Sequence, residues 1–403
     1  MAVQHLVVVG ASLAGLRAAG AARALKFPGR VTLVGDEEHL PYDRPPLSKA
    51  YLEAPDGPRV PQLPGADRLT SDLDVDLVLG APATGLDPRA RVLAVGDREI
   101  PFDALVIATG VRPRALPGAD GLAGVHTLRT LDDAVAIRRK LDAGARTVVI
   151  GAGFIGSEVA SSARSRGLPV TVVESLPTPL VRAVGTTAGA ALAGLHARNG
   201  TDLRCGVSVE EVLGDDHVTG VRLSDGTVLD ADLVVVGIGA EPATAWLSGS
   251  GLTLDNGVVC DATLAAAPGV HAAGDVARWH NPAFDRLMRL EHWTSAAEQG
   301  AHAVRNALDP AAATPYRHVP YFWSDWYGSR IQFAGVPHGE PEIVDGGWDE
   351  PSFAALYRDG DRLAGVVTLD KRADVMKYRA LITRGGSWSD GLELAAQRRS
   401  AAA

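Results

Sequence analysis

Two glycine-rich turns, about 140 residues apart, constrain the fold of this chain more than any other feature. The first ends the apolar run LVVVG (6–10) and the second lies within VVIGAGFIGSE (148–158). At both places an aliphatic run, a glycine turn, a helix-forming stretch and a second β-branched run follow in the same order. This order is typical of a strand–helix–strand unit that binds a dinucleotide. The sequence therefore predicts an α/β protein with two nucleotide-binding units.

The second turn matches the dinucleotide fingerprint at all three glycines. Gly151 permits the tight turn, Gly153 lets the backbone approach a pyrophosphate, and Gly156 lets helix and strand pack closely. Glu174 closes the next predicted strand, where a carboxylate accepts hydrogen bonds from ribose hydroxyls and repels a 2′-phosphate. NADH is therefore the expected ligand, in preference to NADPH.

The first turn departs from the fingerprint at one position, because it reads Gly10, Ser12 and Gly15. A small side chain such as Ser12 is tolerated there if it hydrogen-bonds a phosphate. Asp36 is the expected ribose acid, with Glu37 as the alternative. Two such sites predict that one dinucleotide stays bound while the other exchanges. A flavin is the expected resident, since it takes a hydride from NADH and releases electrons singly.

Charge and cysteine content exclude several other classes. The net charge of −9 argues against a nucleic-acid partner, and no apolar stretch approaches the length of a membrane helix. The N-terminal MAVQHLVVVG is expected to be a first strand and not a signal peptide. Cys205 and Cys260 form no CxxC pair, and the histidines show no metal-ligand spacing. We therefore expect a cytoplasmic protein without a metal site.

The residue pattern of the chain changes after residue 312. Aromatic residues gather at YFWSDWY (321–327), the alternating segment 353–369 predicts an antiparallel hairpin, and the final RRSAAA is expected to be a frayed tail. The segment 371–384 holds five basic residues, which indicate either a docking face for an acidic protein or a solvated helix face. These features predict a smaller C-terminal α+β domain.

Several motifs occur in the order of a known family. They are GDEEHLPYDRPPLSKAYL (35–52), LVIATGVRPR (105–114), LRTLDDA (128–134), GAGFIGSE (151–158), GVHAAGDVAR (269–278) and FWSD (322–325). Across nearly its whole length the chain resembles the FAD-dependent NADH:ferredoxin reductases of the putidaredoxin reductase and Rieske dioxygenase type. The resemblance implies two Rossmann-like domains of glutathione-reductase type, with the NADH domain (111–236) inserted into an FAD domain (1–110 and 237–312), followed by a C-terminal domain (313–403). The second turn would lie far along the chain because its domain is an insertion.

The resemblance also implies the residues around each cofactor. Arg44 and Lys49 would approach the flavin, Ala83 would meet the adenine, Asp275 would accept from the ribityl chain and Trp293 would bring its backbone near the ring. The full FAD set is Gly10, Ser12, Leu13, Ala14, Gly15, Asp36, Glu37, Arg44, Lys49, Ala83, Thr109, Gly110, Arg129, Gly274, Asp275 and Trp293. The full NADH set is Gly151, Gly153, Phe154, Ile155, Gly156, Glu158, Glu174, Arg182, Gly239 and Glu291.

Lys49 and Glu158 are the candidate catalytic residues. Lys49 is expected near flavin N5 and paired with Glu158 across the domain boundary; the alternative is a solvated loop lysine. Disulfide reductases on the same fold need a redox cysteine at the flavin, and the loop YDRPPLSKAYL (42–52) has none. Electrons are therefore expected to leave the flavin directly, past Phe322, Trp323, Trp326 and Tyr327, unless these aromatic side chains are core of the third domain.

The expected partner is a small iron–sulfur ferredoxin that serves a cytochrome P450 or a Rieske oxygenase, and the reductase itself is expected to be a monomer or weak dimer. Two alternatives stay open. One is a rubredoxin reductase or a plain NADH oxidase. The other is a redox-sensing flavoprotein that resembles apoptosis-inducing factor, in which a long-lived reduced complex matters more than turnover.

Overall fold

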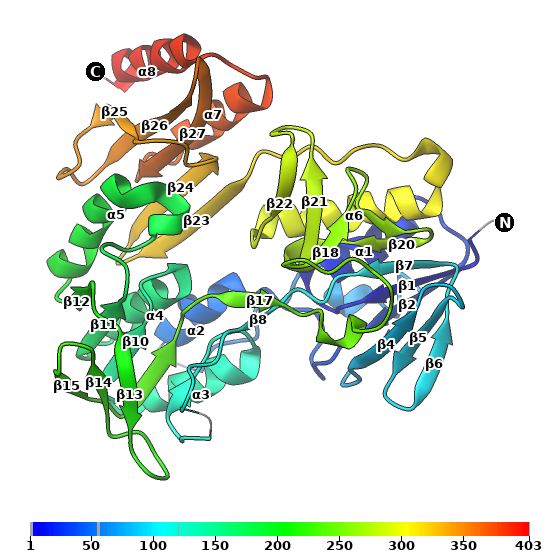
Figure 1. The fold of residues 1–403 in the computed structure, drawn as a ribbon, viewed down its shortest axis with the longest axis horizontal. Coiled ribbons are helices and arrows are strands. Elements are labelled where there is room, and N and C mark those ends of the chain that lie inside the picture. Colours follow the sequence, from blue (N-terminus) through cyan, green and yellow to red (C-terminus); the bar gives the residue numbers. More distant parts are fainter. Residues whose placement is uncertain (1–2, 55–56, 120, 403) are drawn as a thin grey trace. The chain divides into compact units, whose positions relative to one another are not determined.

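The computed structural model describes residues 3–54, 57–119 and 121–402. They form two compact units, each made of segments that are distant in sequence (Figure 1). Unit 1 comprises Met1–Asp43, Pro61–Arg112 and Glu241–His318, and unit 2 comprises Arg44–Val60, Pro113–Ala240 and Val319–Ala403. Each unit is built on its own sheet of parallel strands, so the α/β fold class expected from the sequence is confirmed.

Unit 1 contains the first strand–helix–strand repeat. Its main sheet has the strand order β19-β20-β7-β1-β2-β3, and all neighbours are parallel except β19 and β20. The strands are β1 (His5–Val9), β2 (Arg30–Val34), β3 (Val75–Val78), β7 (Ala104–Ile107), β19 (Ala265–Ala267) and β20 (Val270–Ala272). Helices α1 (Leu13–Ala24) and α6 (Trp293–Leu308) pack against each other beside this sheet.

Smaller elements complete unit 1. One antiparallel sheet joins β4 (Ala83–Asp87), β5 (Val92–Val95) and β6 (Arg98–Pro101), and another sheet joins β18 (Val258–Cys260), β21 (Ala277–Asn281) and β22 (Arg286–Arg289). The short helices are η2 (Ala66–Arg68), η3 (Ala245–Leu247), η4 (Gly274–Val276) and η5 (Pro310–Ala312). Strands β8 (Val111–Pro113) and β17 (Ala240–Pro242) lie where the chain passes from one unit to the other.

Unit 2 contains the second repeat, in a sheet with the order β12-β11-β10-β16-β9 and only parallel pairs. Its strands are β9 (Val125–His126), β10 (Thr147–Ile150), β11 (Val170–Glu174), β12 (Asp202–Cys205) and β16 (Leu233–Val236). The helices are α3 (Leu131–Asp142), α4 (Phe154–Ser165) and α5 (Val181–Arg198), and a small antiparallel sheet is formed by β13 (Val209–Leu213), β14 (Gly220–Leu223) and β15 (Val228–Asp230). Strands β10, β11 and β16 thus repeat the arrangement of β1, β2 and β7.

The C-terminal part of unit 2 is an antiparallel sheet with the order β23-β24-β27-β26-β25. Its elements are β23 (Tyr321–Trp326), β24 (Ser329–Gly335), β25 (Glu342–Gly346), β26 (Phe353–Asp359), β27 (Arg362–Leu369), α7 (Asp374–Thr383) and α8 (Trp388–Ala402). The predicted hairpin is confirmed as β26 and β27. The expectation of a frayed tail was wrong for residues 398–402, which belong to α8, because the Arg398 guanidinium binds Asp374 at 2.6 Å and anchors the helix.

The segment 44–60 belongs to unit 2, although the flanking residues 43 and 61 belong to unit 1. It forms η1 (Pro45–Ser48) and α2 (Ala50–Glu53). The buried Arg138 of α3 donates to the carbonyl oxygens of Tyr51 (2.8 Å) and Ala54 (2.5 Å), and Arg166 donates to that of Leu52 (2.6 Å). These guanidinium groups satisfy carbonyls that a short helix leaves open at its end, and so attach the segment to the second nucleotide unit.

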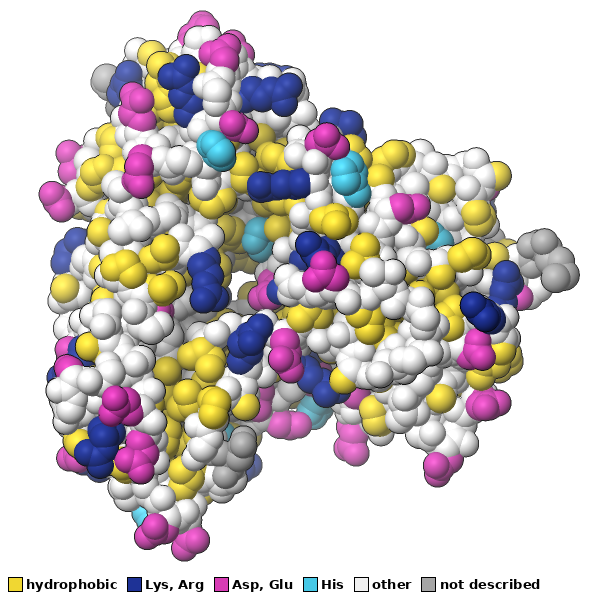
Figure 2. Space-filling view, viewed as in Figure 1, with side chains coloured by type: hydrophobic (Ala, Val, Ile, Leu, Met, Phe, Trp, Pro, Cys, Tyr) yellow, Lys and Arg dark blue, Asp and Glu magenta, His cyan; other side chains and the backbone are white. Residues whose placement is uncertain are grey.

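Charged side chains of both signs are interspersed over the face drawn in Figure 2, with apolar side chains between them. Among the residues that the structure describes, no helix has both the length and the hydropathy needed to span a bilayer.

Candidate functional site

The glycines of both predicted fingerprints lie at tight strand-to-helix turns. A side-chain carbon added to Gly15 would lie 1.9 Å from the carbonyl oxygen of Gly10, and one added to Gly156 would lie 2.1 Å from that of Gly151. Neither turn accepts any other residue at these positions without moving backbone. The two turns therefore have the same close packing between the helix and the preceding strand, as the fingerprint predicts.

Helices α1 and α4 both begin without a side-chain capping hydrogen bond from their N-cap residue. The side chain of Ser12, the N-cap residue of α1, makes no capping hydrogen bond, Gly153 at the N-cap of α4 has no side chain, and neither first turn contains an acidic residue. Helix α3 is different, because Thr130 and Asp133 form a capping box at its start. The first amide groups of an α-helix have no acceptor within the helix and carry its positive dipole end. The geometry therefore fits the pyrophosphate of one dinucleotide at each of the two turns.

The structure also explains why serine is accepted in the first turn. Gly153 is the N-cap residue of α4 and Ser12 is the N-cap residue of α1. A side-chain carbon added to Gly153 would meet no protein atom closer than 3.8 Å. Because the protein itself leaves room at this position, Ser12 fits without distorting the turn.

The candidate ribose acids are arranged differently in the two turns. Asp36 is exposed just after β2, whereas Glu37 is half-buried and accepts a hydrogen bond from the Tyr42 hydroxyl. At the end of β11, Glu174 accepts backbone hydrogen bonds from Ala152 (2.8 Å) and Leu176 (2.8 Å). Its carboxylate is therefore held beside the second turn, where a ribose is expected.

In unit 1 the AAGD segment meets the first turn. A side-chain carbon added to Gly274 would lie 3.2 Å from the Cβ atom of Ala14, so the two segments are neighbours. The buried Gln299 of α6 accepts a hydrogen bond from the Gly274 amide at 2.8 Å, and Arg289 donates to the Asp275 carbonyl at 3.1 Å. These contacts fix the segment that the resemblance assigns to the ribityl chain.

The remaining predicted FAD residues are divided between the units. Thr109 Oγ1 donates to the carbonyl oxygen of Ala243, and the Trp293 indole donates to Asp43 at 2.8 Å, all within unit 1. Ala83 begins β4 in the same unit. Arg44 and Arg129 belong to unit 2, where Arg44 Nη1 donates to the Arg129 carbonyl at 2.5 Å.

The predicted NADH residues lie in unit 2, with Glu291 as the exception. Ile155 is a large apolar side chain with 41% exposure at the start of α4, and Arg182 is exposed in the first turn of α5. Gly239 adopts φ +105°, and a side-chain carbon added there would lie 3.9 Å from Arg114 Cδ, an ordinary contact. Glu291 belongs to unit 1 and pairs with Arg289 at 2.8 Å.

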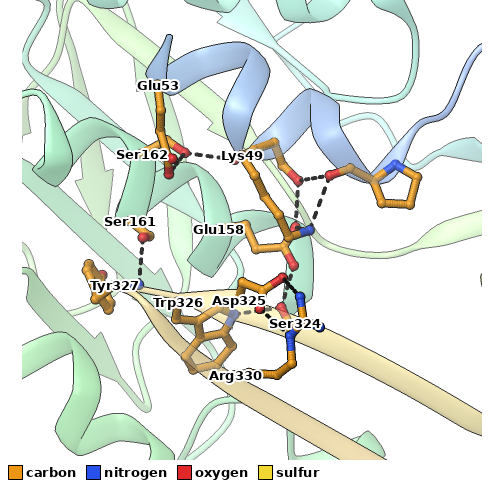
Figure 3. Close-up of polar contacts among 12 residues, drawn as sticks. Lys49, Glu53, Glu158, Ser161, Ser162, Ser324, Asp325, Trp326, Tyr327 and Arg330 are labelled. Carbon is orange, nitrogen blue, oxygen red and sulfur yellow. Dashed lines mark hydrogen bonds and ion pairs between the residues drawn. The ribbon is translucent and has the colours of Figure 1, made fainter. Parts of the chain in front are cut away.

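Lys49 and Glu158 form the expected ion pair (Figure 3). Both belong to unit 2, so the pair does not join two units as expected, because segment 44–60 is attached to the second nucleotide unit. The Lys49 ammonium lies 2.7 Å from Glu158 Oε2, with the lysine side chain 19% exposed and the glutamate side chain 5% exposed. Lys49 is therefore not a solvated loop lysine. The Ser48 hydroxyl also donates to Glu158 Oε2, at 2.5 Å, and the Ser324 hydroxyl donates to Oε1. These donors satisfy a carboxylate that is nearly withdrawn from water.

The two cysteines lie in β-strands and are poor nucleophiles. Cys205 is in β12 of unit 2 and Cys260 is in β18 of unit 1, and both are free thiols. Burial raises the pKa of Cys260 to about 12, and burial together with the Glu174 charge raises the pKa of Cys205. In the described part of the chain, no group of three potential ligands could hold a metal ion.

Most of the aromatic group at 322–327 is core of the C-terminal sheet. Trp326 is fully buried and Phe322 is 8% exposed, and both belong to the cluster that joins this sheet to α5. Phe154 of α4 lies against Phe322, with ring centroids 4.7 Å apart. Trp323 points to the other face of β23 and is half-buried.

Sequence reasoning missed four residues that hold the predicted site residues. Ser48 and Ser324 bind Glu158, Gln299 binds the AAGD segment, and Arg289 binds both Glu291 and the Asp275 carbonyl. Ser48 and Ser324 stand inside the quoted motifs RPPLSK and FWSD, which was the only signal available for them. Their partners are distant in sequence, so the spacing could not reveal them.

Comparison with known proteins agrees with this geometry. Residues 4–300 match the family described as pyridine nucleotide-disulphide oxidoreductase, and residues 321–397 match the domain described as reductase C-terminal. Rhodocoxin reductase of Rhodococcus erythropolis is 38% identical over 94% of this chain and 89% of its own length. The ferredoxin reductase component of chlorobenzene dioxygenase from Cupriavidus sp. (strain PS12) is 40% identical, with coverage of 94% and 92%.

A solved structure gives the same result for the fold. The crystal structure of the covalent putidaredoxin reductase–putidaredoxin complex superimposes with a TM-score of 0.89 at 33% identity and covers 98% of both chains. The family model spans most of the chain, and the two relatives exceed 30% identity over nearly all of it. The chain therefore belongs to the pyridine nucleotide-disulphide oxidoreductase family, in the branch that carries the reductase C-terminal domain.

Proposed function

We propose that the protein is an NADH-dependent ferredoxin reductase, which passes electrons from NADH through FAD to a small iron–sulfur ferredoxin. The observation that carries this proposal is the pair of tight glycine turns in one chain, each at the start of a helix and each followed by an acid. One dinucleotide site would make a dehydrogenase, but two sites in a chain without a reactive thiol suit a flavoprotein that passes electrons onward.

FAD is assigned to the first turn and is tightly bound. Leu13, Ala14 and Gly15 would hold its pyrophosphate by their amides, Asp36 its ribose, and Asp275 its ribityl chain. The neighbouring positions of Ala14 and Gly274 support this assignment, because both must contact one ligand. When bound, the flavin supplies the step between two-electron and one-electron chemistry.

NADH is assigned to the second turn and exchanges during turnover. Gly151, Gly153 and Gly156 would receive its pyrophosphate, and Glu174 would accept the adenosine ribose. The half-exposed Ile155 supports an apolar ligand surface at the start of α4. Lys49 and Glu158 would set the charge beside the reacting rings, since hydride transfer depends on orientation and electrostatics more than on acid–base chemistry.

The ferredoxin is assigned by the relatives and by charge. The relatives are named rhodocoxin reductase and a ferredoxin reductase component of a dioxygenase, which supports a ferredoxin that serves a cytochrome P450 or a Rieske oxygenase. On α7 and its flanks, Arg372, Lys377 and Arg384 are exposed, whereas Lys371 pairs with Asp345 and Arg379 contacts Val319. We assign the docking of an acidic ferredoxin to the three exposed cations.

The assay that tests the proposal is an anaerobic titration of the purified yellow protein with NADH. It is followed by turnover with a [2Fe–2S] ferredoxin and cytochrome c as reporter. We expect prompt bleaching of the flavin and cytochrome reduction that depends on ferredoxin. Bleaching without ferredoxin dependence would instead indicate an NADH oxidase or a redox sensor, and rubredoxin in place of ferredoxin tests the rubredoxin reductase alternative. A purified protein without flavin would contradict the assignment of the first turn.

The finer features of the proposal follow from the same assignment. We propose the FAD domain at 1–110 and 237–312, the NADH domain at 111–236 and the C-terminal domain at 313–403. The two free thiols support a reducing cytoplasm as the compartment. A monomer or weak dimer is expected, which sedimentation of the flavin-bound protein would test.

A further inference from the structure

Ser324 is a polar residue on an otherwise aromatic face of β23. Side chains alternate along a strand, so Ser324 points to the same side as Phe322 and Trp326. Ser324 and Trp326 are both 0% exposed, and the Trp326 indole nitrogen donates to Ser324 Oγ at 2.9 Å. The Ser324 hydroxyl in turn contacts Glu158 Oε1 on α4 (Figure 3). A hydroxyl in such a position would be costly without these partners.

The donor and acceptor in each hydrogen bond from Trp326 through Ser324 to Glu158 follow from the chemistry of the groups. The indole N–H of Trp326 only donates, and an ionised carboxylate only accepts. Ser324 therefore accepts from Trp326 and gives its single proton to Glu158. The line from Trp326 through Ser324 to Glu158 has one possible orientation, and Trp326 is itself fixed within the core that joins the C-terminal sheet to α5.

Glu158 receives donors on both oxygens as a result. Lys49 pairs with Oε2 and Ser48 donates to it, and among the described residues Ser324 donates to Oε1. Donors on both oxygens restrict rotation of the carboxylate about its terminal bond more than donors on one oxygen do. The contact on Oε1 therefore also helps to hold the Lys49 ammonium, which pairs with Oε2.

We propose that Ser324 is a positioning residue for the hydride-transfer step, acting through Glu158 and Lys49. This inference rests on the proposed function, because it needs the Lys49–Glu158 pair to lie beside the reacting rings. It assigns to the C-terminal domain a role in the first half of the reaction, in addition to any role in ferredoxin docking.

A neighbouring hydrogen bond offers a control that distinguishes a positioning role of Ser324 from a packing role. One turn further along α4, Ser161 accepts a hydrogen bond from the Tyr327 amide at 2.8 Å. This contact joins the same strand end to the same helix but does not involve Glu158. Ser161→Ala is therefore a matched control, because it removes a buried hydroxyl and weakens the same packing while leaving the carboxylate untouched.

The experiment measures flavin reduction by NADH in a stopped-flow instrument for the flavin-bound wild type, Ser324→Ala, Ser324→Thr and Ser161→Ala. We expect Ser324→Ala to lower the limiting rate about tenfold, the effect of one hydrogen bond to a charged group, with the Kd for NADH unchanged. Ser324→Thr keeps the hydroxyl and should restore the rate. Ser161→Ala should lower the melting temperature and leave the rate unchanged.

A double-mutant cycle then tests whether Ser324 acts through Glu158. In the Glu158→Ala background, the further change Ser324→Ala should leave the rate unaltered, and its effect on the melting temperature should also shrink. The proposal is overturned if Ser324→Ala retains the wild-type rate, if Ser161→Ala slows the reaction equally, or if the loss persists without Glu158. Failure of NADH to reduce the wild-type flavin would instead refute the proposed function, and the melting-temperature cycle would still report on the Ser324–Glu158 contact.

Discussion

The substitution Gly156→Ala should weaken productive NADH binding about 100-fold while FAD remains bound. The added Cβ atom would lie 2.1 Å from the Gly151 carbonyl oxygen, and real contacts of this kind are not shorter than 3.0 Å. The start of α4 must therefore retreat from the turn by about 0.9 Å. The amides that would bind the pyrophosphate move with it, because they belong to the same helical turn.

The expected magnitude follows from this displacement. A misplacement of about 1 Å in a binding site costs on the order of 100-fold, so kcat/KM for NADH should fall by that factor. The assay is flavin bleaching as a function of NADH concentration, with the flavin absorbance per protein as the measure of bound FAD. The substitution Gly15→Ala should give the opposite result, namely loss of FAD, since its Cβ atom would lie 1.9 Å from the Gly10 oxygen.

Gly153→Ser is the matched control for this prediction. Its Cβ atom would meet no protein atom closer than 3.8 Å, and serine already occupies the equivalent position at residue 12. We expect only a modest rise in the KM for NADH. If Gly156→Ala bound NADH as the wild type does, or if Gly153→Ser were equally damaging, the close packing of the second turn would not be what shapes the site.

Three further predictions concern stability, specificity and docking. Burial lowers the pKa of His196 from 6.5 to about 4, so the unfolded chain binds the proton more tightly than the folded chain does. The free energy of unfolding, measured with urea, should therefore fall by about 3 kcal/mol as the pH drops from about 6.5 to about 4. The substitution His196→Gln should flatten this pH dependence. The substitution Glu174→Ala should reduce the preference for NADH over NADPH about tenfold, because it removes the charge that repels a 2′-phosphate. The preference is measured as the ratio of the two kcat/KM values. An unchanged ratio would mean that other residues set the selectivity. The substitutions Lys377→Glu and Arg384→Glu should raise the KM for ferredoxin and weaken the salt dependence of that KM. The rate of NADH-dependent ferricyanide reduction should stay constant. If turnover with ferredoxin did not vary with ionic strength, docking at these cations would be contradicted.

The local sequence determined the two nucleotide turns. Gly10, Gly15, Gly151 and Gly156 could be placed in advance because the fingerprint is a short-range requirement, set by the packing of one helix on the strand before it. The repeated strand–helix–strand order was predicted for the same reason, since apolar runs and glycine stops are readable within a few residues. The ion pair of Lys49 and Glu158 was expected only through the family resemblance, because 109 residues separate the partners.

Only the tertiary structure decided what surrounds these residues. The attachment of segment 44–60 to unit 2 depends on Arg138 and Arg166, whose carbonyl partners lie 84 to 114 residues away. Trp326 could equally have faced a ligand or the core, and the register of β23 placed it in the core. Ser324 reaches Glu158 across 166 residues. No local pattern encodes such contacts, because they arise only when packing brings separate segments to one point, and burial then requires each polar group to find a partner there.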